Sequence, residues 1–323
     1  MMNILERSMR RRLLRDPRRA SARRRGTASG RRAARGLALV AVLWMVAALM
    51  VTATGVLYAV RGEVRTVASF REMAAAGAIG DAGVILAARE LAGAQKPESR
   101  LQQSEISFEQ VAVGIRIVPL TGLIDLNSAP EPLLTNLIAI AGEVDRGRAA
   151  RLAQRIIDWR DTDDQPQPDG AEDSAYAAAG SPFRTRGGPF ESTEDLLQVL
   201  DIDFDLYDRI RPLVTVHLGG NGRVDPAAAP LPVLRVLAAG NEQIASAYAG
   251  ARETSGALAD TTRFPAAFVA RSPSSRYLIE ASVPLSSGAF LVTRRILDVA
   301  SAQEGLAWET LWAERVVEAG LNG

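Results

Sequence analysis

Cysteine is absent from this chain of 323 residues, and histidine occurs once, at His217. The first absence excludes disulfides, thiol catalysis and thiolate metal sites. A lone histidine between Val216 and Leu218 is expected to be structural and to lie near a strand end. The chain also lacks a phosphate loop, a Gly-x-Ser-x-Gly turn and a His-Glu-x-x-His helix. We therefore predict no catalytic residue and no enzyme, since no aromatic or polar sugar cleft accompanies the remaining acid pair, Asp158 and Glu172.

Acidic residues are scarce at the start of the chain and frequent afterwards. Residues 1–36 hold thirteen arginines against Glu6 and Asp16, a net charge of +11. The rest of the chain then carries 25 basic and 35 acidic residues, a net charge of −10. Because nucleic-acid binding depends on positive charge, an acidic body predicts no nucleic-acid partner.

One long uncharged run, residues 37–60, follows the arginines. Its 24 residues would form a helix of roughly 36 Å at about 1.5 Å per residue, enough to cross a hydrocarbon core of about 30 Å. The basic flank is expected to stay in the cytoplasm. The pattern predicts a single-pass membrane protein with its body on the outer side.

The order of charge and apolar run is unlike that of a secretory signal, because the small residue Gly36 precedes the run that starts at Leu37. This order resembles a prepilin-type leader cut between Gly36 and Leu37. Together with the run itself and the segment Val60-Arg61-Gly62-Glu63-Val64-Arg65, it resembles the K-type minor pseudopilin of type II secretion systems.

The resemblance implies a function, a location and partners. The function would be to cap the tip of the periplasmic pseudopilus and help initiate its assembly for export across the outer membrane. The location would be the bacterial inner membrane, with the amino terminus cytoplasmic and the body periplasmic. The partners would be other minor pseudopilins, the major pseudopilin and the prepilin peptidase, which would also methylate the new amino terminus.

The fifth residue after the expected cut is Ala41, where pilin-like proteins usually carry glutamate. That glutamate pairs with the free amine of the subunit ahead in the fibre, and a charge buried in lipid is costly unless it is paired. A tip subunit has no subunit ahead of it. Ala41 is therefore the expected tip marker, and the K-type family is similar in lacking the glutamate.

Hydrophobic periodicity predicts an α+β fold: a long amino-terminal transmembrane helix packed on an antiparallel sheet, with a large all-α insertion. Alternating residues at 104–119, and a hairpin around Ser286–Gly288, predict strands; residues 307–317 could form a last strand or a short helix. The expected divisions are a basic leader (1–36), a transmembrane helix (37–60), a pilin-like helix with the first strands (61–119), an inserted helical lobe with an acidic loop (120–218), a second helical lobe (219–262) and carboxyl-terminal strands (263–323).

Within the first lobe, Ser128 is the expected helix N-cap ahead of Pro130, and a second helix is expected over 145–159. The segment 222–234 echoes 122–134 in its Asp, Ala-Pro and leucine positions, by duplication or by convergence on proline at helix starts. Residues 122–159 also resemble a helix-hairpin-helix module. This leaves an alternative function as a membrane-tethered DNA-binding protein or type IV pilus minor pilin, although acids in the turn would repel phosphate.

Residues 158–173 form an acidic loop with seven carboxylates and one arginine. So many like charges indicate either a solvent-exposed acidic loop or a site for a hard dication with oxygen ligands. The residues alone favour neither interpretation over the other. The spacing from Asp161 is EF-hand-like, but Pro166 stands where that loop needs glycine.

The resemblance favours calcium, because Asp161 to Tyr176 is similar to the calcium segment of K-type pseudopilins. The implied ligands are Asp161, Asp163, Glu172 and Asp173, with Asp164 and Asp169 in addition. The family's asparagine ligand after the Tyr-Arg pair is missing at Phe183–Gly187, so one or two calcium ions are expected.

Overall fold

The structure is a computed structural model that describes residues 30–94, 99–108, 110–255, 259–300 and 307–320. It divides into two compact units, Met1–Val67 and Ala68–Gly323. The leader residues 1–29 lie outside the described part. Helix α1 covers Gly30–Gly93 and so contributes to both units.

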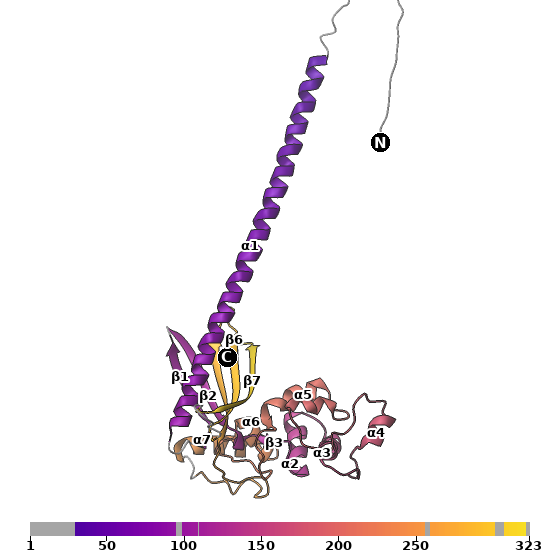
Figure 1. Cartoon of the computed structure of the whole chain (residues 1–323), viewed down its shortest axis with the longest axis vertical. Coiled ribbons are helices and arrows are strands. Elements are labelled where there is room, and N and C mark those ends of the chain that lie inside the picture. Colours follow the sequence, from indigo (N-terminus) through magenta and orange to yellow (C-terminus); the bar gives the residue numbers. More distant parts are fainter. Residues whose placement is uncertain (1–29, 95–98, 109, 256–258, 301–306, 321–323) are drawn as a thin grey trace, which may run out of the picture. The chain divides into compact units, whose positions relative to one another are not determined.

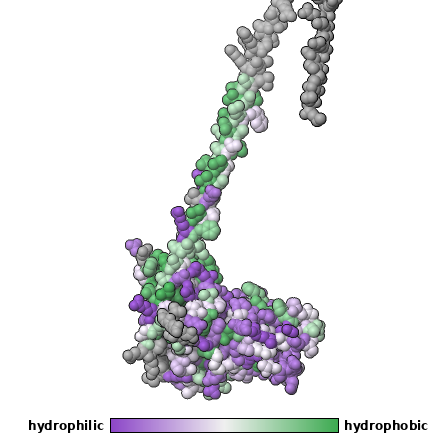
Figure 2. Space-filling model, viewed as in Figure 1, coloured by the Kyte–Doolittle hydropathy of each residue, from purple (hydrophilic) through white to green (hydrophobic). Residues whose placement is uncertain are grey.

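The first unit contains one membrane-length apolar segment, within the stretch Ala38–Gly93. Figure 2 shows hydrophobic side chains along this helix, and its large apolar side chains, such as Leu43 and Trp44, are exposed rather than packed inside the protein. Within residues 37–60, Thr52 and Thr54 donate their hydroxyls to the helix backbone, to the carbonyl of Leu49 at 2.9 Å and to that of Met50 at 2.7 Å. These bonds leave neither hydroxyl unsatisfied in an apolar solvent.

The second unit contains an antiparallel five-stranded sheet, shown beside α1 in Figure 1. Its order is β1-β2-β5-β6-β7. The strands are β1 (Gln102–Phe108), β2 (Val111–Pro119), β5 (Arg276–Pro284), β6 (Phe290–Asp298) and β7 (Glu309–Glu318). The predicted α+β class, the strands within 104–119 and the hairpin around Ser286–Gly288 are confirmed, and the last segment is the strand rather than the helix. The sheet is therefore assembled from both ends of the body, with β2 paired to β5 across the helical part.

Glycines let α1 approach the sheet closely. A Cβ on Gly80 would lie 2.6 Å from Thr293 Oγ1, and one on Gly83 would lie 2.9 Å from Ile115 Cδ1. A Cβ at either position would force the Thr293 or Ile115 side chain to shift, so the glycines serve the close packing of strands against the helix. After these glycines, Val84, Ala88 and Leu91 bury their side chains against the sheet.

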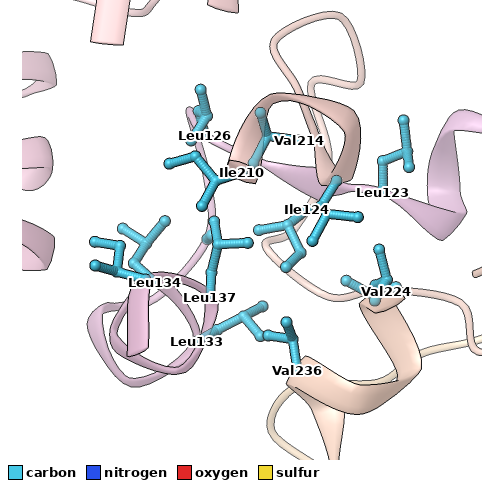
Figure 3. Close-up of a cluster of buried hydrophobic side chains, with 14 of the residues drawn as sticks. Leu123, Ile124, Leu126, Leu133, Leu134, Leu137, Ile210, Val214, Val224 and Val236 are labelled. Carbon is cyan, nitrogen blue, oxygen red and sulfur yellow. The ribbon is translucent and has the colours of Figure 1, made fainter. Parts of the chain in front are cut away.

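The helical part lies between β2 and β5 in the sequence. It contains η1 (Leu120–Gly122), β3 (Ile124–Asp125), α2 (Glu131–Asn136), the π-helical turn η2 (Leu137–Ala141), α3 (Arg146–Arg160), α4 (Asp173–Ala178), η3 (Thr193–Gln198), α5 (Phe204–Ile210), η4 (Arg211–Leu213), β4 (Val214–Thr215), α6 (Leu231–Leu237) and α7 (Glu242–Ser255). Strands β3 and β4 pair in parallel. One buried hydrophobic cluster runs through this part from Leu120 to Phe264, and Figure 3 shows its centre.

One local prediction is wrong. Helix α2 has Pro130 at its N-cap, not Ser128. The Ser128 hydroxyl instead donates to Asp125 Oδ2 at 2.7 Å, because the buried Asp125 carboxylate closes the turn before the helix. Helix α3 starts one residue after the expected position, with Asp145 as its N-cap.

The two echoed segments pack directly on each other, and the contact is reciprocal. A Cβ on Gly122 would lie 2.3 Å from the carbonyl oxygen of Ala228, and one on Gly222 would lie 2.2 Å from that of Ser128. Helices α2 and α6 start in the same way, at Pro130 and Pro230. The glycines at 122 and 222 thus serve one close backbone contact. We call the two segments that meet there, residues 122–129 and 222–229, the hub. Whether the two halves are separate lobes or a duplication stays a prediction.

We predict that Gly122→Ala destabilises the protein by about 3 kcal/mol, since its Cβ meets backbone atoms that cannot move as a side chain would. The control is Gly250→Ala in α7, where a Cβ meets nothing within 4 Å. That control should stabilise by about 0.5–1 kcal/mol through helix propensity. Chemical denaturation of the full-length protein in detergent measures both. A Gly122→Ala variant as stable as the wild type would contradict the reciprocal contact.

Candidate functional site

The acidic loop starts from the end of α3, where Asp158 is fully buried. Its carboxylate accepts hydrogen bonds from the backbone N–H groups of Gln167 and Ala171, at 3.1 and 2.7 Å. Gly170 packs against this carboxylate. A Cβ at that position would lie only 1.8 Å from Asp158 Oδ2, so no larger residue fits. Burial is the main cause that raises the pKa of Asp158, and these two N–H donors oppose it. Asp158 therefore holds the loop in shape, a role that its position in the sequence does not reveal.

Two acids of the loop have oxygens that are both buried and without a hydrogen-bond partner. These are Asp161 Oδ1 and Glu172 Oε1. Glu172 is 5% exposed and is the N-cap residue of α4. Burial, with the charge of Asp158 next in effect, raises the pKa of Glu172 to about 7. Buried polar groups in folded proteins are nearly always paired, so these two oxygens fit a cation between the end of α3 and the start of α4.

The other four predicted ligands are exposed. Asp163 Oδ1 accepts from the N–H of Gln165, and Asp173 Oδ1 accepts from both the N–H and the hydroxyl of Thr185. Asp164 and Asp169 are also at the surface. Across the described residues, which include all of 158–176, no three of these acids form a ready cluster of metal ligands. The structure thus buries Glu172 and one carboxylate oxygen of the half-buried Asp161, and it uses Asp173 to attach the segment at Thr185.

Thr185 lies in the segment where the family's asparagine is missing. Its two bonds to Asp173 bring residues 183–187 back to the loop, and the N–H groups of Arg186 and Gly187 both donate to the carbonyl of Trp159, at 3.2 Å. The sequence does not predict the contact between Thr185 and Asp173, because threonine is common in loops and a single one is not distinctive.

Each half of the hub has one arginine bound to its backbone carbonyls, Arg160 through two nitrogens and Arg252 through one. Arg160, at the end of α3, donates from Nη1 to the carbonyl of Leu126 and from Nη2 to that of Ala129, at 2.8 Å. Arg252, in α7, donates from Nη1 to the equivalent carbonyls of Pro226 and Ala229. Both are half-buried. Burial lowers the pKa of each guanidinium, so both bind neutral carbonyls at some electrostatic cost.

The turn before α3 is not arranged to receive phosphate. Asp145 places its own carboxylate on the helix N-terminus, accepting from the N–H of Arg148 at 3.0 Å. Glu143 has a positive φ of 54°, and its acidic side chain is where a helix-hairpin-helix turn would need a small neutral residue. Because the carboxylate occupies the anion-binding end of the helix, this turn disfavours phosphate, and the expected absence of a nucleic-acid partner stays a prediction.

The predicted processing and tip residues all lie in α1. Gly36 and Leu37 are helical in the structure, and Ala41 is exposed on the helix. No described contact of this segment tests their roles, which stay predictions.

The fold and the acidic loop together define a class: an α+β domain with an amino-terminal apolar helix, an antiparallel sheet and an inserted helical part. Comparison with known proteins agrees with the predicted resemblance. Residues 125–218 match the family described as type II secretion system (T2SS), protein K.

Three comparisons show how far the likeness extends. The chain is 36% identical over 85 residues to the type II secretion system protein K of Pectobacterium carotovorum subsp. carotovorum, and 34% identical over 87 residues to the putative type II secretion system protein K of Escherichia coli (strain K12). Each match covers about a quarter of this chain and spans 26% of the relative. The fold matches a chain in the crystal structure of the GspK-GspI-GspJ complex from enterotoxigenic Escherichia coli, with a TM-score of 0.51, at 16% identity, over 79% of this chain and 99% of that chain.

We predict that Asp158→Asn destabilises the protein by about 1–3 kcal/mol, because an amide can accept with only one oxygen and its NH2 group would face the backbone donors. The exposed Asp163→Asn is the matched control and should change stability by less than about 0.5 kcal/mol. Thermal unfolding in chelator, where no divalent ion contributes, measures both variants. Equal unfolding temperatures for the two variants would show that Asp158 does not hold the loop.

Proposed function

We propose that this protein is a minor pseudopilin of a type II secretion system, which caps the tip of the periplasmic pseudopilus and helps initiate its assembly. The observation that carries the proposal is the combination of two matches. The helical part matches the protein K family over residues 125–218, and the fold as a whole matches a chain of the GspK-GspI-GspJ complex. The role is structural, and we assign no catalysis to it.

The membrane segment supports the same role. The chain has one apolar stretch long enough to cross a membrane, preceded by thirteen arginines within residues 1–36. The positive flank favours a cytoplasmic amino terminus and a periplasmic body, anchored in the inner membrane. Cleavage between Gly36 and Leu37 and methylation of the new amine would leave Ala41 at the fifth position, without the glutamate that an internal subunit needs.

We further propose that the acidic loop binds one or two calcium ions. The buried, unpartnered oxygens of Asp161 and Glu172 are the supporting observation. Asp163, Asp164, Asp169 and Asp173 are exposed and close in sequence, so they could complete the oxygen shell of six to eight ligands that calcium takes. The ion would neutralise the loop and supply no redox or acid–base chemistry.

The proposed role predicts a complex with the I-type and J-type minor pseudopilins of the same bacterium. Full-length protein in detergent, mixed with both, should elute as one species with one copy of each in size-exclusion chromatography with light scattering. A duplex DNA is the control ligand, tested with protein that lacks the basic residues 1–36, and it should not bind at low salt because the body is acidic. Absence of the complex, or salt-dependent DNA binding, would favour the DNA-binding alternative.

Calcium should raise the unfolding temperature relative to chelator. A ligand that binds only the native state contributes about 2.7 kcal/mol at a hundredfold excess over its Kd. The double variant Asp161→Asn, Glu172→Gln should lose this gain, yet be no less stable than the wild type in chelator, because it removes charge from two carboxylates that each have a buried oxygen without a hydrogen-bond partner. Magnesium should substitute poorly, since it prefers a small octahedral shell. Identical wild-type melting curves in calcium and chelator would make the loop a solvated acidic surface.

Processing should occur between Gly36 and Leu37. Mass spectrometry of the mature protein should show an amino terminus at Leu37 carrying one methyl group.

Ala41→Glu should allow incorporation at internal fibre positions or impair secretion, because the added carboxylate can pair with a neighbour's amine. A different amino terminus would refute the processing site, and a silent Ala41→Glu variant would refute the tip marker.

A further inference from the structure

Arg160 is next to the proposed ligand Asp161 in the chain, yet its side chain points to another part of the protein. It binds the carbonyls of Leu126 and Ala129, in the segment that connects β3 to α2. Within the described part of the chain, no carboxylate lies within ion-pair distance of this guanidinium. At the end of α3, Asp161 thus belongs to the acidic loop, whereas the adjacent Arg160 binds the hub.

The segment held by Arg160 has contacts on several sides. The N–H of Leu126 donates to the carbonyl of Thr215 in β4, at 2.9 Å. The Asn127 side chain accepts from the N–H of Phe190 at 2.7 Å and donates to its carbonyl at 3.0 Å. The Phe190 ring in turn stacks on Trp159, with the ring centroids 4.2 Å apart. Segment 126–129 therefore lies between the end of α3 and the β3–β4 pair.

These contacts continue to the large sheet. The chain leaves β4 through His217, whose carbonyl accepts from Arg276 Nη1 at the start of β5. Arg276 is fixed by an ion pair with the buried Asp298 of β6, at 2.8 Å. A contiguous set of hydrogen bonds and one ion pair thus joins the end of α3 to the sheet.

We propose that Arg160 couples occupation of the acidic loop by a divalent cation to ordering of the hub segment 126–129. The coupling rests on the cation binding proposed above. A cation that fixes Asp161 fixes the last turn of α3, and this positions the Arg160 fork on its two carbonyls. By thermodynamic linkage, the ordered segment in turn strengthens cation binding. Arg160 is a positioning residue and not a ligand.

Arg252 provides a control within the same chain. It makes the equivalent contacts in the other half of the hub, and it is followed by Glu253 and Thr254 instead of the run of acids that follows Arg160. Loss of either arginine should loosen its own half. Only loss of Arg160 should change cation binding.

The sign of the effect separates coupling from simple electrostatics. Arg160→Gln removes a positive charge close to the cation, which by Coulomb's law alone would tighten binding. The coupling predicts the opposite, a calcium Kd about tenfold higher, within the range usual for coupled sites. Arg160→Lys keeps the charge but loses the planar two-pronged donor, so it should also weaken binding.

The experiment uses the full-length protein in detergent with calcium chloride as the probe. Titration calorimetry measures Kd, and hydrogen exchange measures protection of the Leu126 and Phe190 amides in calcium and in chelator. In the wild type and in Arg252→Gln, calcium should bind with similar Kd and increase the protection of both amides. In Arg160→Gln and Arg160→Lys, the Kd should rise and the calcium-dependent gain in protection should be lost.

Three results would overturn the coupling. These are a Kd for Arg160→Gln equal to or below that of the wild type, an equal loss of affinity in Arg252→Gln, and wild-type calcium binding that leaves the protection of both amides unchanged. Each of them leaves the calcium site itself intact. Absence of any calcium binding by the wild type would instead refute the site and the coupling together.

Discussion

The helical part depends on one steric constraint, the close approach of two backbone segments at Gly122 and Gly222. Gly122 lies against the carbonyl of Ala228, and Gly222 lies against that of Ser128, so closely that a Cβ on either glycine would overlap the carbonyl oxygen. The Asp225 N–H donates to the carbonyl of Thr121 at 2.7 Å, which adds a hydrogen bond to the same contact. Burial of the surrounding leucines and valines supplies the free energy that holds the two segments together (Figure 3).

The candidate site depends on this hub through α3. The helix buries Leu152, Ile156 and Trp159 in the common cluster, which fixes where its last turn ends and therefore where Asp158, Arg160 and Asp161 point. Asp158 then shapes the loop that follows, and Glu172 is returned to the same place by the start of α4. A rigid scaffold can in this way hold two acids, each with one buried oxygen, in positions that charge repulsion would otherwise disfavour.

Much of this arrangement could be predicted from the sequence, and the failures have physical reasons. Alternation along residues 104–119 and the Ser286–Gly288 turn predicted strands, because period-two burial and turn chemistry are local properties. The echo of Gly122 in Gly222 was visible, but the sequence does not show that the two segments touch each other. Ser128 was wrongly predicted as the N-cap because a serine shortly before a proline is typical of a helix start. In the structure its hydroxyl donates to the buried carboxylate of Asp125 instead. The roles of Asp158, Thr185 and Arg160 depend on contacts between distant segments, which no local pattern records.

The central claim is that residues 122–129 and 222–229 form one cooperative hub that carries the acidic loop. Native-state hydrogen exchange of the full-length protein tests it most directly, through the amide of Leu126, which donates to Thr215, and that of Asp225, which donates to Thr121. The account predicts that both exchange only through the same, most stable opening, with equal free energies and equal denaturant dependence. If the Asp225 amide exchanged through a separate, less stable opening, the second half would be an independent lobe, and the hub would not be the structural basis of the site.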